Sequence, residues 1–322
     1  MKLTAQVKLL PTDDQRAALL VTMARVNRAC DFASAVAWKA QVFRQFDLHR
    51  LAYRDIREQF GLAAQVTARA IAKVADAYKL DHDTQREFRP FGGICYDSRI
   101  LSWMGESASI WTLGGRERIP FVCGDHHRKL LEGARGETDL LYRGGEVYLH
   151  VSVEVEAQAE VAPSAWLGVD LGLANIAVDS DGVAYSGAKI DEVREKTRVL
   201  RAALQSKGTK SAKRHLKRLR RKERNFHSHT NHVISKAIVR KAKDTGRGVA
   251  LEDLSGITKR VTVRHAQCAR LHSWSFAQLR AFVTYKAILL GVALGLVDPR
   301  NTSRTCPECG CIDKRNRMTQ AE

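Results

Sequence analysis

Residues 166–172 read Trp-Leu-Gly-Val-Asp-Leu-Gly, and this short stretch decides how the second half of the chain is expected to fold. Its apolar residues predict a strand that ends at Asp170. A second strand is predicted at residues 175–178, followed by turn residues at 179–182 and a third strand at 183–185. Consecutive short strands joined by tight turns predict an antiparallel arrangement.

A second acid closes an apolar strand further along the chain. Residues 249–251 read Val-Ala-Leu and are followed by Glu252. Carboxylates at the ends of neighbouring strands can hold Mg²⁺, and two such metals about 4 Å apart can clamp the attacking water and the leaving oxygen of a phosphodiester. Gly172 would let a phosphate approach the backbone after Asp170. Taken alone, the pattern favours ordinary strand-terminal acids, because short motifs match often by chance.

Other acids and polar residues nearby are interpreted more plainly. Asp179, Asp181 and Asp253 are interpreted as turn or solvated residues. The histidines at 227, 229 and 232 do not share one helix face, so we interpret them as nucleic-acid or packing contacts, with Asn231 as a polar contact near the active site. A helix is predicted at 273–290, in which Trp274 and Phe276 are assigned to the core.

Residues 190–243 are predicted to be mostly helical and are strongly basic. A basic run is usually a solvated helix face. Here the density of cations is high and few acids interrupt it, which favours contact with a nucleic-acid backbone. The predicted contact residues are Lys213, Arg214, Lys217, Arg218, Arg220, Arg221, Lys222 and Arg224.

The overall composition also favours a protein that binds nucleic acid. The chain has 322 residues, 44% of them hydrophobic, and a formal net charge of +18. This length suits about two domains with packed cores, and the charge favours polyanionic partners. No apolar run of about 18 residues could span a bilayer, and the N-terminus lacks the apolar segment of a signal peptide. A cytoplasmic nucleic-acid-binding protein with no membrane partner is therefore expected.

The first part of the chain predicts one strand, then helices, then a small β structure. Residues 3–9 alternate apolar and polar side chains, and residues 11–13 carry helix-start signals. A further helix is predicted at 66–78. Glycines punctuate short apolar runs between 90 and 160, including a strand at 146–153, which indicates a small antiparallel sheet or barrel.

Three of the seven cysteines cluster near the C-terminal end. Cys306 and Cys309 form a C-x-x-C knuckle, and Cys311 is an extra thiol beside it. A structural zinc site needs four ligands, so this knuckle supplies half of a site, and zinc binding stays open. The scattered cysteines, including Cys30 and Cys268, are interpreted as small core residues.

Several stretches together resemble the TnpB/OrfB proteins of bacterial insertion sequences. Leu167–Gly172 resembles the first RuvC motif of that family and Leu251–Leu254 the second. Asp298–Gly310 resembles the lead into its zinc ribbon, and residues 225–232 and 273–276 are also similar to the family. The resemblance covers residues 166–322 in the correct order and residues 1–160 more loosely.

The resemblance implies a fold and a site. The expected architecture is an N-terminal β-barrel with inserted helices at 1–163, an α/β RNase H-like (RuvC) nuclease domain at 164–298, and a partial zinc ribbon at 299–322. Asp170 and Glu252 would be the first two members of a three-carboxylate metal site. The implied activity is RNA-guided, Mg²⁺-dependent cleavage of DNA with a guide RNA from the end of the element. Older annotation calls such proteins transposases.

Three functions stay open from the sequence. In the family, a second C-x-x-C and a third catalytic Asp follow the knuckle, and neither is present by Glu322, so a C-terminally truncated member is expected. The chain is then an active RNA-guided endonuclease, a nuclease-dead RNA- and DNA-binding protein, or a transposase that transfers DNA strands. The missing acid favours the second over the first for this chain, and no Tyr or Ser nucleophile motif supports the third.

Overall fold

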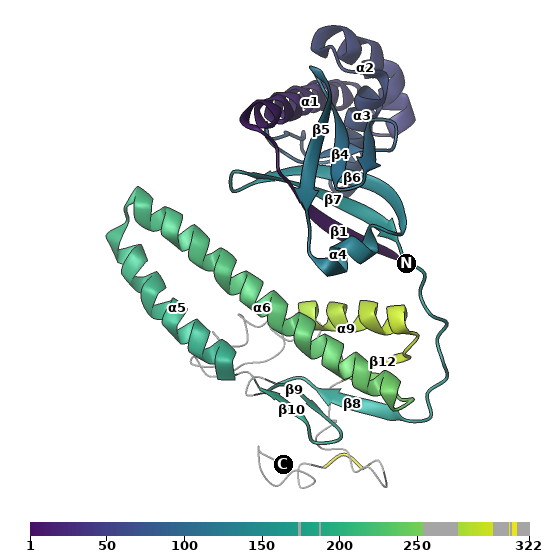
Figure 1. Ribbon diagram of the computed structural model, residues 1–322, viewed down its shortest axis with the longest axis vertical. Helices are drawn as coiled ribbons and strands as arrows, with labels where there is room; N and C mark the ends of the chain where they lie inside the picture. Colours follow the sequence, from purple (N-terminus) through teal and green to yellow (C-terminus); the bar gives the residue numbers. More distant parts are fainter. Residues whose placement is uncertain (173–174, 187, 254–275, 299–308, 310, 314–322) are drawn as a thin grey trace. The chain divides into compact units, whose positions relative to one another are not determined.

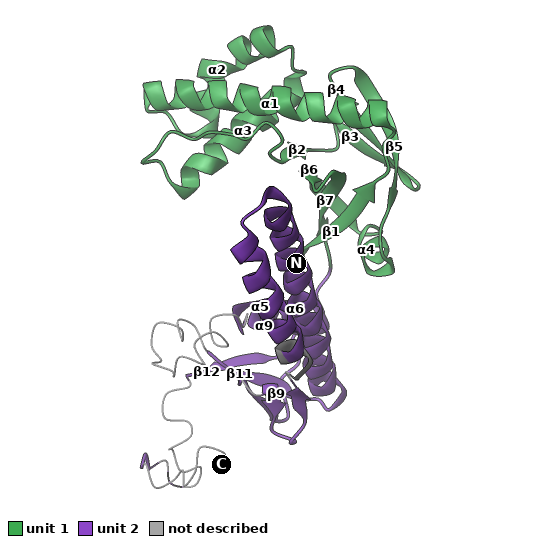
Figure 2. Ribbon diagram, turned by 90° about the vertical axis from the view of Figure 1, so that its left-hand side faces the viewer, with its two compact units in different colours: residues 1–155 green, residues 156–322 purple. Residues whose placement is uncertain are grey.

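Two compact units make up the chain, Met1–Val155 and Glu156–Glu322 (Figure 2). The computed structural model describes residues 1–172, 175–186, 188–253, 276–298, 309 and 311–313. Each unit has its own cluster of buried apolar side chains. The domain boundary predicted at 163/164 lies within the second unit, in the segment that leads to its first strand.

An antiparallel sheet of seven strands forms the frame of the first unit (Figure 1). Its strands are β1 (Lys2–Leu9), β2 (Ile94–Tyr96), β3 (Leu101–Met104), β4 (Ser107–Thr112), β5 (Gly115–Val122), β6 (Ala134–Arg143) and β7 (Glu146–Glu154). They lie in the order β2-β6-β7-β1-β5-β4-β3. The short helix α4 (Asp125–Leu130) connects β5 to β6. The predicted strands at 3–9 and 146–153 are confirmed as β1 and β7.

The connection between its two edge strands curls this sheet into a nearly closed barrel. β2 ends at Tyr96 and β3 begins at Leu101. A link this short spans at most about 18 Å, whereas the edges of a flat seven-stranded sheet would lie about 29 Å apart. The hydroxyl of Tyr96 also donates a hydrogen bond of 3.0 Å to the carbonyl of Trp111 in β4. The predicted N-terminal barrel is therefore confirmed in this nearly closed form.

Three helices are inserted into the barrel between β1 and β2, as predicted. They are α1 (Asp13–Ala40), α2 (Gln45–Phe60) and α3 (Ala64–Leu80). α1 begins at a capping box in which the side chains of Thr12 and Gln15 each accept a hydrogen bond from the backbone of the other residue. Leu19, Met23 and Val26 lie on its buried face and join the barrel core.

The second unit is an α/β unit built on a mixed five-stranded sheet. Its strands are β8 (Trp166–Asp170), β9 (Asn175–Asp179), β10 (Ala184–Ser186), β11 (Gly248–Glu252) and β12 (Leu294–Val297), in the order β10-β9-β8-β11-β12. The strands from β8 to β10 are antiparallel neighbours, as predicted, whereas β11 runs parallel to both β8 and β12. Parallel neighbours need long crossovers, and helices provide them here.

The crossover helices are α5 (Ala188–Lys207), α6 (Lys210–Asp244) and α9 (Phe276–Leu290). Figures 1 and 2 show α6 and α9 on one face of the sheet. Leu167, Val169 and Leu251 point from the sheet into this core, where Ile238 of α6 and Leu279 of α9 are also fully buried. Among the described helices, none is long and apolar enough to cross a membrane.

Candidate active site and nucleic-acid interface

The two predicted acids lie side by side at the carboxyl ends of paired parallel strands. β8 and β11 are in register with Val169 opposite Leu251, so the next residues along the strands are Asp170 and Glu252. The two carboxyl groups are close enough to share a hydrogen bond. The fold therefore brings together side chains that are 82 positions apart in the sequence (252 − 170).

Strand alternation turns these carboxylates away from the helices. In β8, Leu167 and Val169 are buried in the core and Asp170 is exposed on the opposite face. Glu252 is half-buried and follows the buried Leu251. Gly172 follows β8 closely, and an added Cβ on it would lie 3.0 Å from the carbonyl oxygen of Asn175, the first residue of β9. A larger residue there would push β9 away from Asp170.

The carboxyl group of Glu252 keeps its proton to a higher pH than a free carboxyl group does. Burial raises the pKa of Glu252, and the neighbouring charge and hydrogen bond of Asp170 raise it further, to about 7. Two adjacent carboxylates resist ionising together because their charges repel. A divalent cation removes this repulsion, and hard carboxylate oxygens are the ligands that Mg²⁺ prefers.

The pair offers two protein ligands. In the part of the chain that the structure describes, no group of three or more His, Cys, Asp or Glu side chains is arranged to hold a metal. Mg²⁺ usually keeps several waters and binds through one or two carboxylates together with substrate phosphates. Two adjacent carboxylates on an exposed sheet face therefore fit such an ion.

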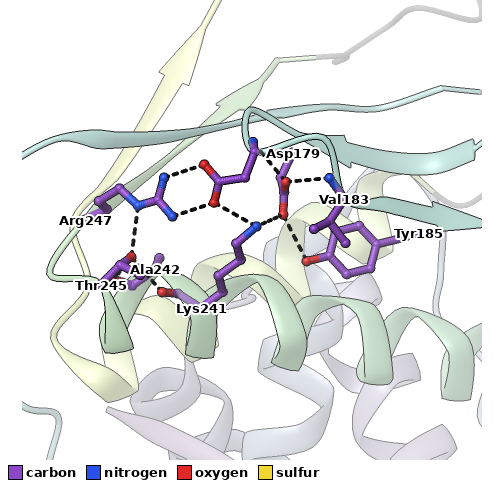
Figure 3. Close-up of polar contacts among 8 residues, drawn as sticks. Asp179, Val183, Tyr185, Lys241, Ala242, Thr245 and Arg247 are labelled. Carbon is purple, nitrogen blue, oxygen red and sulfur yellow. Dashed lines mark hydrogen bonds and ion pairs between the residues drawn. The ribbon is translucent and has the colours of Figure 1, made fainter.

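A buried ionic cluster beside the site was missed by sequence reasoning (Figure 3). The carboxylate of Asp179 has a side-chain exposure of 0% and accepts an ion pair of 2.7 Å from Lys241. It also accepts hydrogen bonds from the backbone N–H groups of Asp181 and Val183 and from the hydroxyl of Tyr185. The predicted turn is confirmed, but the interpretation of Asp179 as a solvated residue is wrong.

The same cluster includes a second acid. Lys241 also contacts Asp181 at 2.8 Å, and the guanidinium of Arg247 binds Asp181 through two hydrogen bonds of 2.7 and 2.8 Å. Burial alone would raise the pKa of Asp179. The hydrogen bonds that its carboxylate accepts from Lys241 and from the backbone of Val183 and Asp181 outweigh burial, so the pKa is lowered. Val169 of β8 lies opposite Asp179 of β9. The cluster thus joins β9, the strand next to Asp170, to the C-terminal end of α6.

The basic residues predicted to contact nucleic acid lie on the first half of α6. All eight, from Lys213 to Arg224, are exposed, and none forms an ion pair with a described residue. Lys213, Lys217, Arg220 and Arg224 follow one another at helical spacing and form one stripe. Ala212 is buried and Leu216 is half-buried on the side that packs toward α5.

The cations of α5 differ from those of α6. Lys196 pairs with Glu192 at 2.6 Å, and Arg198 pairs with Glu195 at 2.6 Å. Arg201 pairs with Glu223 of α6 at 2.6 Å and joins the two helices. Paired cations attract phosphates less than unpaired ones, so the α6 face is the stronger candidate for anion binding in this helical hairpin.

Two polar predictions fall between α6 and α9. Asn231 is fully buried, and its Nδ2 atom donates a hydrogen bond of 2.9 Å to Gln278. The ring of His232 stacks on Phe282 at a centroid distance of 3.8 Å. Phe276 is buried in the core as predicted. Trp274 lies outside the described residues.

The cysteine knuckle lies mostly outside the part of the chain that the structure describes. Cys309 and Cys311 are exposed, whereas Cys306 and Cys268 are not among the described residues. Cys30 is fully buried in the core of the first unit, as predicted. Burial raises the pKa of its thiol to about 12, so it is an unreactive packing residue.

Family models match two stretches of this chain. Residues 150–255 match the OrfB_IS605 model, a probable transposase, and residues 276–321 match the TNB domain of Cas12f1-like proteins. The first match includes both Asp170 and Glu252. A TnpB-like protein of Methanocaldococcus jannaschii is 36% identical over 81 residues, which cover 25% of this chain and 29% of that protein.

These stretches of the chain are thus similar to TnpB/OrfB and Cas12f1-like proteins.

Other similar proteins are CRISPR-associated endodeoxyribonucleases. Cas12f1 of Sulfoacidibacillus thermotolerans is 31% identical over 197 residues, which cover 56% of this chain and 45% of the relative. Cas12f1 of Syntrophomonas palmitatica is 29% identical over 176 residues, or 49% of this chain and 34% of the relative. This chain therefore spans less than half of the length of either relative.

Solved structures share the fold. A Cas12f1 in complex with sgRNA and target DNA aligns with a TM-score of 0.63 at 13% identity, covering 94% of this chain and 77% of that one. The mini-RNA-guided endonuclease CRISPR-Cas phi3 aligns with a TM-score of 0.59 at 10% identity, covering 99% and 88%. At these identities the likeness is one of fold.

Proposed function

We propose that this chain is an RNA-guided, Mg²⁺-dependent DNA endonuclease and that its second unit is an RNase H-like (RuvC) nuclease domain. The observation that carries the proposal is the pairing of Asp170 with Glu252 at adjoining strand ends. Similarity to the two Cas12f1 proteins supports the activity, because they are endodeoxyribonucleases. The fold supports the same assignment, because it is shared with a Cas12f1 solved with sgRNA and target DNA.

In this mechanism Asp170 and Glu252 hold the metal. A bound Mg²⁺ supplies Lewis acidity at the phosphate and lowers the pKa of an attacking water. Glu252 must release its proton before it can act as a ligand, because its pKa lies at about 7 beside Asp170. Asp170 lies on the exposed face of the sheet, where a phosphate of the DNA strand could reach the pair.

The partners in this proposal are DNA and a guide RNA. The exposed cations of α6 would contact the phosphate backbone and thereby set affinity and position without reading sequence. Base pairing to the guide would supply the specificity, as in other RNA-guided nucleases. Cys306 and Cys309 would supply half of a zinc site in the C-terminal segment.

Cleavage of target DNA tests the proposal. The purified chain is mixed with RNA transcribed from its flanking sequence, target DNA and Mg²⁺. We expect wild-type protein to cut the DNA and Asp170→Ala or Glu252→Ala to lower the rate on the order of 100-fold or more, because each removes a metal ligand worth several kcal/mol in the transition state.

A neighbouring acid provides the matched control. Asp253 follows Glu252 directly and pairs with Arg280, so Asp253→Asn removes a similar charge from the opposite strand face and should keep most of the activity. Binding of RNA and DNA without cutting by wild-type protein would support the nuclease-dead alternative. Cutting that survives both Asp170→Ala and Glu252→Ala would refute the proposed site.

A further inference from the structure

The open face of the second sheet carries an aromatic side chain in line with the carboxylates. Along β8, Trp166, Gly168 and Asp170 alternate with the buried Leu167 and Val169. They therefore share the face that points away from α6 and α9. Trp166 is the first residue of the strand and Asp170 the last.

The indole of Trp166 lies across the neighbouring strands. A Cβ built on Gly248 of β11 would lie 2.7 Å from its Cζ3 atom, and one built on Gly295 of β12 would lie 3.3 Å from the same atom. The ring thus fills the space above two glycines and spreads along the sheet. Trp166 is nevertheless 49% exposed, so much of the ring surface is open to a ligand.

Small residues separate this ring from the carboxylates. Gly168 pairs with Ala250, and Ala250 pairs with Gly295, which puts three of the smallest side chains in one row across β8, β11 and β12. The next row on this face holds Asp170 and Glu252. On these three strands, nothing larger than a methyl group projects from the row of Gly168, Ala250 and Gly295, and Ser180 borders it beside Gly168. Small side chains therefore lie between the ring and the acids.

We propose that Trp166 is a stacking platform for a base of the single DNA strand whose phosphate reaches Asp170 and Glu252. An aromatic ring stacks on any nucleobase without reading its identity, which suits an enzyme whose specificity comes from a guide. The net charge of +18 favours a polyanionic occupant over an apolar peptide. This inference rests on the proposed function of the carboxylate pair.

The strand geometry sets the distance between the stacked base and the cut. Asp170 is four residue steps along β8 from Trp166, which corresponds to about 13 Å between their backbones. That distance equals about four nucleotides at a stacked spacing of ~3.4 Å, and fewer if the strand is stretched. One base within four nucleotides of the scissile phosphate is therefore the predicted partner of Trp166.

Fluorescence tests the platform without requiring cleavage. A single-stranded oligonucleotide of 12 nucleotides, added to the Asp170→Ala protein so that it is not cut, should quench tryptophan emission, and a strand of equal length without bases should quench less. Trp166→Phe in this background should remove most of the difference between the two strands. Trp103→Phe, a matched loss of one indole in the first unit, should leave it. If the Trp166→Phe protein shows the same difference in quenching between the two strands, the proposed stacking role of Trp166 is wrong, whether or not the protein is a nuclease.

Cleavage kinetics give a second readout. Trp166→Ala should raise KM for the cut strand by roughly 5- to 150-fold with kcat little changed, and Trp166→Phe should keep KM near the wild-type value. Moving one abasic site along the target strand should raise KM at a single position in wild-type protein, and Trp166→Ala should lose that position dependence. Retention of the position dependence in Trp166→Ala would overturn the proposal. A wild-type protein that binds and quenches but does not cut would refute only the nuclease function.

Discussion

The pKa of Glu252 depends on its burial and on its neighbour Asp170. Its carboxyl group would ionise fully at neutral pH in water, yet beside Asp170 its pKa is raised to about 7. A proton and a metal ion therefore compete for the same oxygens. This competition connects the strand register to a measurable pH dependence.

Mg²⁺ affinity should fall as the pH drops through 7. The raised pKa means that Glu252 carries a proton below about 7 and releases it above, so affinity should be full at pH 8 and about tenfold weaker at pH 6. Calorimetric titration at several pH values measures this and also detects the released proton. The Glu252→Gln protein should bind weakly at every pH. Equal affinity of the wild-type protein at pH 6 and pH 8 would contradict the shared proton.

Lys241 should be a large contributor to stability because its partner is fully buried. Lys241→Met leaves the carboxylate of Asp179, 0% exposed, without its ammonium partner, which should lower the free energy of unfolding clearly more than the loss of an exposed ion pair does. Urea denaturation measures the loss. Arg240→Met is the control, since its pair with Asp244 is exposed at 3.8 Å and should contribute less than about 1 kcal/mol.

A second variant separates the charge from the packing. Asp179→Asn combined with Lys241→Met removes both charges, so the double variant should be more stable than Lys241→Met alone. Equal destabilisation by the two proteins would show that Lys241 acts through packing and not through Asp179.

The position of an acid was predictable where a strand end marked it, but its partner was not. Asp170 and Glu252 stand after short apolar strands, a pattern that alone favours ordinary strand-terminal acids, and the expectation that they share a site came from the family resemblance. Asp179 stands in a turn sequence, Asp-Ser-Asp-Gly, that is the same whether its acids are solvated or buried. The difference is made by Lys241, 62 positions away in the sequence, and a local pattern cannot reveal such a partner.

At the scale of elements, α6 combines two functions in one helix. Its second half packs on the sheet through Ile234, Ile238 and Val239, whereas its first half is exposed and basic. The sequence predicted a basic helical region at 190–243, but the packing of the second half of α6 on the sheet was not predicted. The sequence did not reveal which cations are already paired, and this depends on two acids of α5 and on Glu223 of α6, which pair with the cations of α5.

Neutralising the α6 stripe should weaken nucleic-acid binding and its salt dependence. Replacing Lys213, Lys217, Arg220 and Arg224 with Gln keeps helix propensity, and should reduce the slope of log K against log salt by up to about 3.6 for duplex DNA, or ~0.9 per lost phosphate contact. Binding titrations at several salt concentrations measure the slope. The melting temperature should change little because these side chains are exposed.

The paired cations of α5 give the control for this experiment. Lys196→Gln with Arg198→Gln removes two charges that already have carboxylate partners, so the slope should change much less per charge. A loss per charge as large as that on α6 would assign the interface to the whole hairpin and contradict the role of the α6 face.

For the whole molecule, the separate cores predict independent folding. The first unit closes on itself through hydrogen bonds between Met1 and Val155 and has a core confined to residues 5–153. A fragment of residues 1–157 should therefore melt in one cooperative transition by circular dichroism. A fragment ending at Arg143 lacks β7, which lies between β6 and β1, and should not fold. Absence of a cooperative transition in the longer fragment would contradict the independence of the units.

The central claim is that Asp170 and Glu252 jointly hold a divalent metal, and anomalous diffraction from crystals soaked in Mn²⁺ tests it most directly. One anomalous peak is expected about 2.1 Å from a carboxylate oxygen of each residue. This peak should disappear in crystals of the Asp170→Ala protein. A wild-type map without a peak between these two side chains, or with the side chains on opposite faces of the sheet, would contradict it.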